Sequence, residues 1–338
     1  MNYKKIVGLL LVGIIILSIM IAYIGPEQIF DSIKEANIYY VLLAILLQFI
    51  IMFLWNYRWS IISTELNIKH NILQLFAILI VGLAINDLTP SGRSGGEPVR
   101  AYILSRTSGA SFKQTFATVM SDKIFDTFPF MILAIFAMIY LIFTVHISQM
   151  MLYTLIIALT FFILALLFLI YICFNEELGV KVINWVFTQL DRFTSRDFSK
   201  YHSKALYALT GFQKNLKYLM KNKKLFIVAT IISFLSWFLE LVRVYVVFLA
   251  FGTNVSLGMI AAVFLVSTLV GIIPALPGGL GSIDGLMILL YSVSGISASI
   301  STAATIVERA ISLWMVLILG IIILPYFGTG VLDKVDMT

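Results

Sequence analysis

The chain has 338 residues, of which 61% are hydrophobic and 12% are charged. Soluble proteins contain roughly 45–50% apolar and about 25% charged residues, so this composition excludes a water-soluble fold, and it also excludes disorder, which requires low hydrophobicity. The net charge is +6, and the basic residues are confined to a few segments. This distribution indicates membrane topology rather than nucleic-acid binding. The sequence therefore predicts an all-α polytopic membrane protein.

Apolar runs follow one another along the chain. The first run, 6–24, comes after Lys4 and Lys5 and is followed by Gly25 and Pro26. It is longer than a signal-peptide core, so we expect a retained transmembrane helix. The later runs are 38–55, 71–86, 128–145, 150–173, 225–251, a glycine- and proline-broken stretch within 244–283, 285–291 and 302–324.

The basic residues predict the orientation of these helices. With the N-terminus in the cytoplasm, the segments 58–70, 89–123, 174–224 and the C-terminal tail also lie inside. Together with Lys4 and Lys5, they hold 20 of the 23 lysines and arginines. Lys34 falls outside, and Arg243 and Arg309 lie within spans. Because cytoplasmic loops carry an excess of basic residues, we expect a multi-pass protein of the cell membrane with both termini in the cytoplasm.

This orientation predicts two re-entrant hairpins. Since 58–70 and 89–123 both belong inside, 71–88 should enter the membrane, break at Thr89–Gly92 and return through Tyr102. By the same argument, 257–273 should enter from outside, break at 274–279 and return through Leu290. Broken segments of this kind in two halves are typical of an inverted repeat. We therefore expect one transmembrane domain, 1–338, with repeat one over about 38–173 and repeat two over about 225–325.

A weak local similarity supports the repeat. Pro90 precedes Glu97 by seven residues, and Pro277 precedes Asp284 by seven. The alternative is that glycine, proline and a nearby acid recur by chance in two hairpin tips.

The segment 174–224 carries ten basic residues and four acidic ones. Its apolar residues recur at helical spacing, as in Ile183, Val186 and Leu190. This pattern predicts amphipathic helices that bind the anionic lipid surface of the inner leaflet. A solvated cytoplasmic loop is the alternative.

The stretch 86–100 is the strongest candidate for a binding site. Its glycines permit close approach of the backbone to a ligand, and Pro98 suits the first turn of a new helix. A helix N-terminus flanked by arginines is suited to a phosphate or carboxylate. Together with the tip of the second predicted hairpin, this stretch predicts a substrate site. Its residues are Arg93, Gly95, Gly96, Glu97, Arg100, Gly278, Gly279, Asp284 and Arg309. The alternative is an ordinary cytoplasmic turn.

Charges inside the spans also point to function, because a central charge costs about 2.5–3.5 kcal/mol on insertion scales. Glu240 and Arg243 share a helix face and can pair, and Asp284 is a candidate partner for Arg309. Structural ion pairs that lock helices together are the alternative. Asp122 and Asp126 are interpreted as helix-end residues. The residues expected to have a structural or coupling role are Asp87, Glu240, Arg243 and Glu308.

These motifs resemble a known family. Gly95-Gly96-Glu97-Pro98-Val99-Arg100-Ala101-Tyr102, the later Pro277-Gly278-Gly279-Leu280-Gly281 turn and Arg309 are similar to the lysylphosphatidylglycerol synthase transmembrane family, which includes the flippase half of the bacterial multiple peptide resistance factor. The resemblance covers nearly the whole chain and implies a lipid-translocating membrane domain. The acyl-tRNA-using transferase domain is missing, so lysyl transfer is not implied. Family substrates range from aminoacyl phospholipids to polyprenyl-phosphate sugars.

Two functions are compatible with these features. The first is a flippase that moves a phosphate-headgroup lipid between leaflets, with no cofactor or metal, a membrane lipid as substrate and a homo-oligomer left open. Such transport would be passive or ion-coupled, because no nucleotide motif is present. The second is an intramembrane transferase that uses a polyprenyl-phosphate donor, with Glu27 or Asp31 as the acid. The small outer loops leave little room for an acceptor, so we favour the flippase.

Overall fold

A computed structural model describes residues 18, 22, 26–89, 95–144, 149–193, 199–271 and 276–327, and every regular element within these ranges is a helix. The predicted first span 6–24, apart from residues 18 and 22, falls outside the described residues. So do the tip residues 90–94, which include Arg93, and the C-terminal tail.

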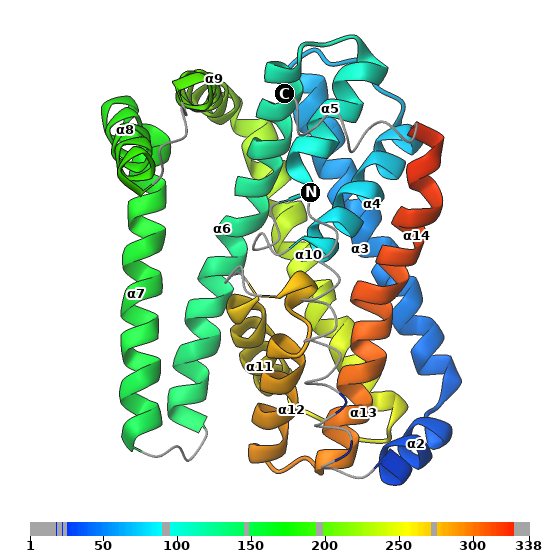
Figure 1. The fold of residues 1–338 in the computed structure, drawn as a ribbon. Helices are drawn as coiled ribbons and strands as arrows, with labels where there is room; N and C mark the ends of the chain where they lie inside the picture. The colour runs from blue at the N-terminus through cyan, green and yellow to red at the C-terminus, as the bar shows by residue number, and fades with distance from the viewer. Residues whose placement is uncertain are drawn as a thin grey trace.

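Two groups of four helices form the centre of the molecule (Figure 1). Unit one comprises α3 (Ile38–Glu65), α4 (Ile72–Leu88), α5 (Glu97–Ser108) and α6 (Phe112–Thr144). Unit two comprises α10 (Lys223–Ala250), α11 (Leu257–Val270), α12 (Ser282–Val293) and one long helix, made of α13 (Ala298–Arg309), η2 (Ala310–Trp314), α14 (Met315–Ile323) and η3 (Leu324–Phe327). The remaining elements are α2 (Pro26–Glu35), α7 (Gln149–Phe174), α8 (Glu176–Phe193), α9 (Ser199–Lys221) and the short η1 (Pro277–Gly279).

The two units begin alike. The N-cap of α3 is Asn37, whose side chain accepts a hydrogen bond from the Tyr39 amide, and the N-cap of α10 is Asn222, whose side chain accepts one from the Leu225 amide. Such caps satisfy amides that have no partner within the helix. Both helices are 28 residues long.

The units run in opposite directions and exchange contacts. The amide of Asn37 donates to the carbonyl of Ala250 at 2.8 Å, so α3 begins where α10 ends. Within unit one α4 packs on α5, and within unit two α11 packs on α12. In addition, α4 packs along α14 of unit two, and α11 packs along α6 of unit one. Each short hairpin therefore lies against the long last helix of the other unit.

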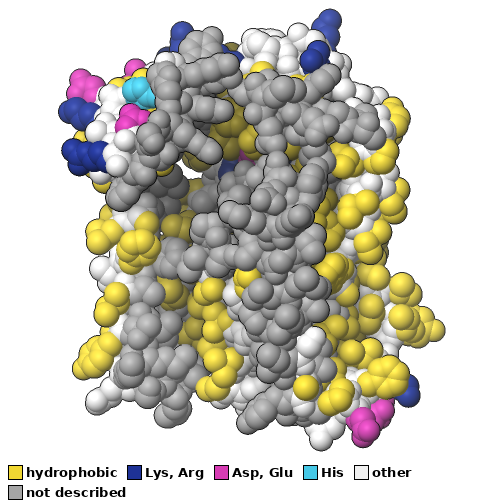
Figure 2. All heavy atoms as spheres, viewed as in Figure 1, with side chains coloured by type: hydrophobic (Ala, Val, Ile, Leu, Met, Phe, Trp, Pro, Cys, Tyr) yellow, Lys and Arg dark blue, Asp and Glu magenta, His cyan; other side chains and the backbone are white. Residues whose placement is uncertain are grey.

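The surface fits a lipid environment. Four of the described helices are long and apolar enough to cross a membrane, namely 38–65, 112–144, 223–250 and 298–327. Figure 2 shows hydrophobic side chains around the middle of the molecule, whereas the charged side chains visible on this face gather at its two ends. The protein is thus an all-α polytopic membrane protein, as the composition predicts. Re-entry of the α4–α5 and α11–α12 hairpins into the membrane stays a prediction.

Two local expectations are wrong. Arg58, which we assigned to a cytoplasmic loop, lies inside α3, and Asp122 and Asp126, interpreted as helix-end residues, lie well inside α6. The reason is that these charges bind one another across the two helices. A charged residue that is paired in this way does not mark the end of a helix. The expected helices in 174–224 are present as α8 and α9, whereas α2 was not expected.

Candidate functional site

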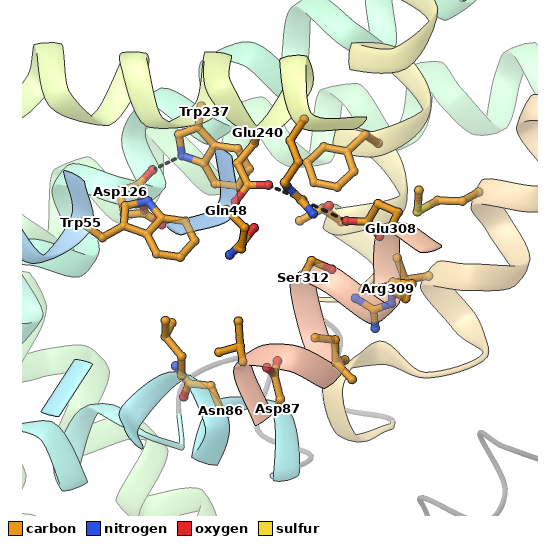
Figure 3. Close-up of a pocket in the computed structure, with 18 of the residues that line it drawn as sticks. Gln48, Trp55, Asn86, Asp87, Asp126, Trp237, Glu240, Glu308, Arg309 and Ser312 are labelled. Atoms are coloured by element: carbon orange, nitrogen blue, oxygen red, sulfur yellow. Dashed lines mark hydrogen bonds and ion pairs between the residues drawn. The ribbon is translucent and has the colours of Figure 1, made fainter. Parts of the chain in front are cut away.

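A cavity of about 160 Å³, lined by both polar and apolar side chains, lies between the two units. Figure 3 shows Asn86 and Asp87 of α4 across this space from Trp237 and Glu240 of α10. The cavity is much larger than the space that one water molecule needs. Its lining residues come from both units: Gln48, Trp55, Leu83, Asn86, Asp87, Lys123, Asp126, Trp237, Glu240, Arg243, Phe264, Thr268, Ile283, Met287, Glu308, Arg309, Ser312, Leu313 and Val316.

The first buried charge network belongs to unit one and centres on Asp122. Arg58 of α3 donates from Nε to Asp122 at 2.8 Å and from Nη1 to Asp126 at 3.0 Å. Arg100 of α5 donates from Nη2 to the second oxygen of Asp122 at 2.9 Å. The guanidinium of Arg100 also lies over the ring of Trp59, 4.1 Å from its centroid. One carboxylate therefore binds α3, α5 and α6 together, and its charge is compensated by two arginines.

The same network continues into the first hairpin tip. Lys123 Nζ lies 3.0 Å from Glu97 Oε1 at the start of α5. Asn86, near the end of α4, accepts a hydrogen bond from the Gly96 amide at 2.6 Å. Gly96 also packs directly on the backbone of Gly82, where an added Cβ would overlap the Gly82 carbonyl. The tip is thus closed by a side-chain hydrogen bond and a glycine contact.

The second network belongs to unit two and centres on Arg243. Its Nη2 donates to Glu240, one turn earlier on α10, and to Glu308 of α13 at 2.9 Å. Arg243 is fully buried, and Glu308 is 2% exposed. Among the described residues, Arg243 Nε and Nη1 and Glu308 Oε2 have no hydrogen-bond partner. In the first network, Arg100 Nε and Glu97 Oε2 also have no partner among the described residues, so both networks have open groups, and those of Arg243 and Glu308 belong to residues that line the cavity.

Arg309 connects the second network to the second hairpin tip. Its Nε lies 2.7 Å from Asp284 Oδ1, which makes an ion pair although the N–H does not point at the oxygen. Its Nη2 donates to the carbonyl of Gly278. Asp284 in turn accepts the amide of Gly281 at 2.7 Å. Gly278 has a φ of 58° and packs against Leu313, a position that only glycine occupies without strain.

The π-helical segment η2 follows Arg309 directly. Such segments are frequent at functional sites. Here Glu308 and Arg309 just before it, and Ser312 and Leu313 within it, all line the cavity.

The charged residues occupy equivalent positions in the two units. Arg58 and Arg243 each lie twenty residues after the first residue of their helix, α3 or α10. Asp122 and Glu308 each lie ten residues after the start of α6 and α13. Lys123 and Arg309 come next in each helix. The pairs Arg58–Asp122 and Lys123–Glu97 thus correspond to the pairs Arg243–Glu308 and Arg309–Asp284.

The residues predicted from sequence divide into two groups. Asp87, Glu240, Arg243, Glu308 and Arg309 line the cavity. Glu97, Arg100 and Asp284 are buried behind it in ion pairs, and Gly96, Gly278 and Gly279 are buried in the hairpin tips, where Gly95 directly precedes Gly96. Arg93 lies outside the described residues.

Several site residues were missed. Arg58, Asp122 and Asp126 were assigned to loops or helix ends, and Lys123 was counted only as a basic loop residue. Gln48 was overlooked because a single glutamine in an apolar run carries no motif. The spacing of Arg58 and Arg243 from the asparagine caps that precede them is a signal by which the first network is recognisable.

Sequence comparisons match this chain to one family model and to several membrane proteins. The family model described as "Lysylphosphatidylglycerol synthase TM region" matches residues 6–320. A UPF0104 membrane protein of Methanothermobacter thermautotrophicus is 42% identical over 326 residues, which cover 96% of each chain. A UPF0104 membrane protein of Methanocaldococcus jannaschii is 30% identical over 94% of each chain. One of Pyrococcus horikoshii is 26% identical over 92% of this chain and 94% of the relative.

Proposed function

This chain belongs to the lysylphosphatidylglycerol synthase transmembrane-region family, and on that premise we propose that it moves a phosphate-headgroup lipid between the two leaflets. Phospholipids, aminoacyl lipids and polyprenyl-phosphate sugars share this headgroup chemistry. The headgroup occupies the cavity between the units, while the hydrocarbon chains stay in the bilayer against the apolar surface.

The observation that carries this proposal is the cavity to which both units contribute charged side chains. Charged groups inside a membrane protein are costly and usually mark a substrate or ion pathway. Arg309 and Arg243 provide cations for a phosphate, since guanidinium groups bind phosphate with charge-assisted hydrogen bonds. Glu97, Arg100 and Asp284 lie behind the cavity wall, and we assign them the role of positioning the hairpin tips.

The transferase alternative has no support from the cavity. Glu27 and Asp31 lie exposed on α2, and neither lines the cavity. A transferase would need its acid beside the phosphate of the donor lipid.

The proposed orientation follows the distribution of basic residues. The end of the molecule that carries α8 and α9 (Figure 1) faces the cytoplasm, and the end that carries α2 faces outward. In protein lacking Cys173, an impermeant thiol reagent applied to intact cells should label cysteines introduced in α2 and should not label those in α8. The reverse labelling pattern would overturn this orientation.

Reconstitution tests the function. Purified protein is placed in liposomes that contain a fluorescent phosphatidylglycerol, a fluorescent aminoacyl phospholipid or a fluorescent polyprenyl phosphate, and a membrane-impermeant quencher measures movement. We expect protein-dependent movement of at least one of these lipids, and a neutral fluorescent glycosyl diacylglycerol, which has a polar headgroup without phosphate, should show no protein-dependent movement. If none of the phosphate lipids moves with folded protein, the proposal fails.

Variants connect this movement to the cavity. Arg309→Gln removes a charge-assisted contact worth about 1.5–3 kcal/mol, so movement should fall about tenfold to a hundredfold. Arg309→Lys keeps the charge and should retain more movement. Lys34→Gln, on exposed α2, is the matched control and should behave as wild type. If lipid moves equally fast with Arg309→Gln and with the wild type, the headgroup does not bind in this cavity.

A further inference from the structure

The second network has an incomplete set of bonds at a buried acid. Glu308 binds the Nη2 of Arg243 through Oε1, and the same nitrogen also binds Glu240. The other oxygen of Glu308 is buried and has no hydrogen-bond partner among the described residues. An ionised carboxylate oxygen without a partner is costly in a membrane interior.

The equivalent acid in unit one, Asp122, has no carboxylate oxygen without a hydrogen-bond partner. Asp122 uses both of its oxygens, one for Arg58 and one for Arg100. Arg58 also donates to Ser233, whereas Gln48, the residue at the same position of α3 as Ser233 in α10, has a buried Oε1 without a partner among the described residues. Arg100 Nε and Glu97 Oε2 of the first network also have no partner among the described residues, but neither residue lines the cavity. The open groups of Gln48, Arg243 and Glu308 belong to residues that do line it.

From this difference we propose that Glu308 binds an exchangeable proton, which travels with the anionic lipid. The inference rests on the proposed function, because it names the ion that accompanies the headgroup. The proton comes from water in the cavity, forms an O–H bond at Oε2, and returns to water on the other side of the membrane. No other reactant is consumed.

Charge balance explains why the proton and the lipid bind together. When Glu308 is ionised, two carboxylates bind Arg243, and a phosphate that enters the cavity meets an excess of negative charge. A proton on Glu308 removes one of these charges and weakens its hold on Arg243. The Nε and Nη1 groups of Arg243, which have no partner among the described residues, are then available to the phosphate. The phosphate and the proton therefore favour each other and move in the same direction.

The helices that pack around Glu308 differ in the charged groups that they present to it. Tyr291 of α12 lies close enough to interact with the charge of Glu308, and α2, which packs on α13, presents its charged side chains to the exterior. The charged groups that share the network or the cavity with Glu308 are Glu240 and Arg243 of α10, Asp284 of α12, Arg309 of α13, Asp87 of α4, and Lys123 and Asp126 of α6.

The test uses liposomes of phosphatidylcholine and phosphatidylglycerol, with fluorescent phosphatidylglycerol as the probe and an imposed pH difference. For one proton per lipid, a difference of one pH unit corresponds to about a tenfold ratio of probe between the leaflets. Wild-type protein should accumulate the probe in the leaflet that faces the alkaline side. Glu308→Gln should abolish this asymmetry, and Glu308→Asp should restore part of it.

The controls separate this inference from the proposed function. If wild-type protein moves the probe but leaves it evenly distributed, the proton coupling is wrong and the flippase proposal stands. If a sodium gradient without a pH difference produces the asymmetry, the proposal that a proton accompanies the lipid is also wrong. Lys34→Gln should keep the wild-type ratio.

A second readout does not depend on transport. Infrared difference spectra of the reconstituted protein, recorded across a pH titration, should show a buried protonated carboxyl group. This band should be absent in Glu308→Gln, shifted in Glu308→Asp and unchanged in Glu27→Gln, which alters an exposed acid on α2. If the wild type lacks the band, or if Glu308→Gln retains it unchanged, the proposal is overturned even in the absence of lipid movement.

Discussion

Asp122 and Glu308 occupy equivalent positions in the two units, yet their surroundings differ. The network around Asp122 joins three acids, Glu97, Asp122 and Asp126, to three cations, Arg58, Arg100 and Lys123. The ion pairs around Glu308 join three acids, Glu240, Asp284 and Glu308, to two cations, Arg243 and Arg309. The position of a charge within such a fold therefore does not by itself determine its role.

The difference between the two networks shows that equivalent charged positions can either fix helices in place or leave groups able to bind a ligand. A fully compensated network in a low-dielectric interior fixes the helices that contribute to it, because each broken pair leaves a buried charge. A network with open donors and an open acceptor beside a cavity can instead exchange partners with a ligand. On the proposed function, we expect unit one to be the fixed part of the molecule and unit two to contain the groups that change state during transport.

The largest expected effect compares the two equivalent acids directly. Asp122→Asn leaves Arg100 buried without a carboxylate among its described partners, and loss of one partner from a buried pair costs about 3–5 kcal/mol. Glu308→Gln leaves Arg243 bound to Glu240 and should cost much less. The thermal unfolding midpoint and the monodispersity of each variant in detergent measure this difference. A similar loss of stability in both variants would remove the distinction between a fixed and an exchanging network.

Much of the fold could be predicted from sequence, because lipid imposes strong constraints. The long apolar runs predicted α3, α10 and the last helix, and the glycines and prolines predicted that the helices are interrupted between α4 and α5 and between α11 and α12. The residue-level pairing of Glu240 with Arg243 followed from helical spacing, and the pairing of Arg309 with Asp284 was also anticipated, as a candidate contact.

The first network was not predicted, and the reason is physical. A lysine or arginine at the end of an apolar run usually marks the membrane surface. Arg58 and Lys123 instead lie within helices, and each binds a carboxylate of another helix, which offsets the cost of removing its charge from water. Such partners are distant in sequence, Arg58 and Asp122 being 64 residues apart, and no local pattern reveals them.

A smaller effect tests whether the first hairpin tip is rigidly packed. Gly96→Ala places a Cβ against the backbone of Gly82, which cannot move aside as a side chain can. Overpacking of this kind costs about 1–3 kcal/mol, and it should also lengthen the hydrogen bond from the Gly96 amide to Asn86. Thermal unfolding in detergent measures the cost. An unchanged midpoint would show that this tip yields easily, and unit one would then not be the fixed part.

The smallest expected effect concerns an ion pair outside the networks, which serves as a reference in water. Lys217 of α9 lies 2.7 Å from Glu176 of α8, and both side chains are exposed. The hydrogen bond and the charge of Lys217 hold the pKa of Glu176 below its ordinary value. The pair therefore stabilises the contact between α8 and α9 at pH values above the ordinary glutamate pKa, and this contribution is lost as the pH falls through the lowered pKa of the folded state. Salt should weaken it, since exposed charges are screened.

Spin labels on α8 and α9, at Lys181 and Tyr218, allow this contact to be followed as a distance during a pH titration. In the wild type the distance should change only at a pH below the ordinary glutamate range. Lys217→Ala should abolish this transition, because the contact between α8 and α9 then no longer includes a bond to the charged Glu176. Lys221→Ala removes another positive charge, in the last turn of α9, and serves as the control. If Lys221→Ala abolishes the transition as well, the general basicity of α9 rather than the Lys217–Glu176 bond controls this contact, and the pair no longer provides a single-contact reference for the buried networks.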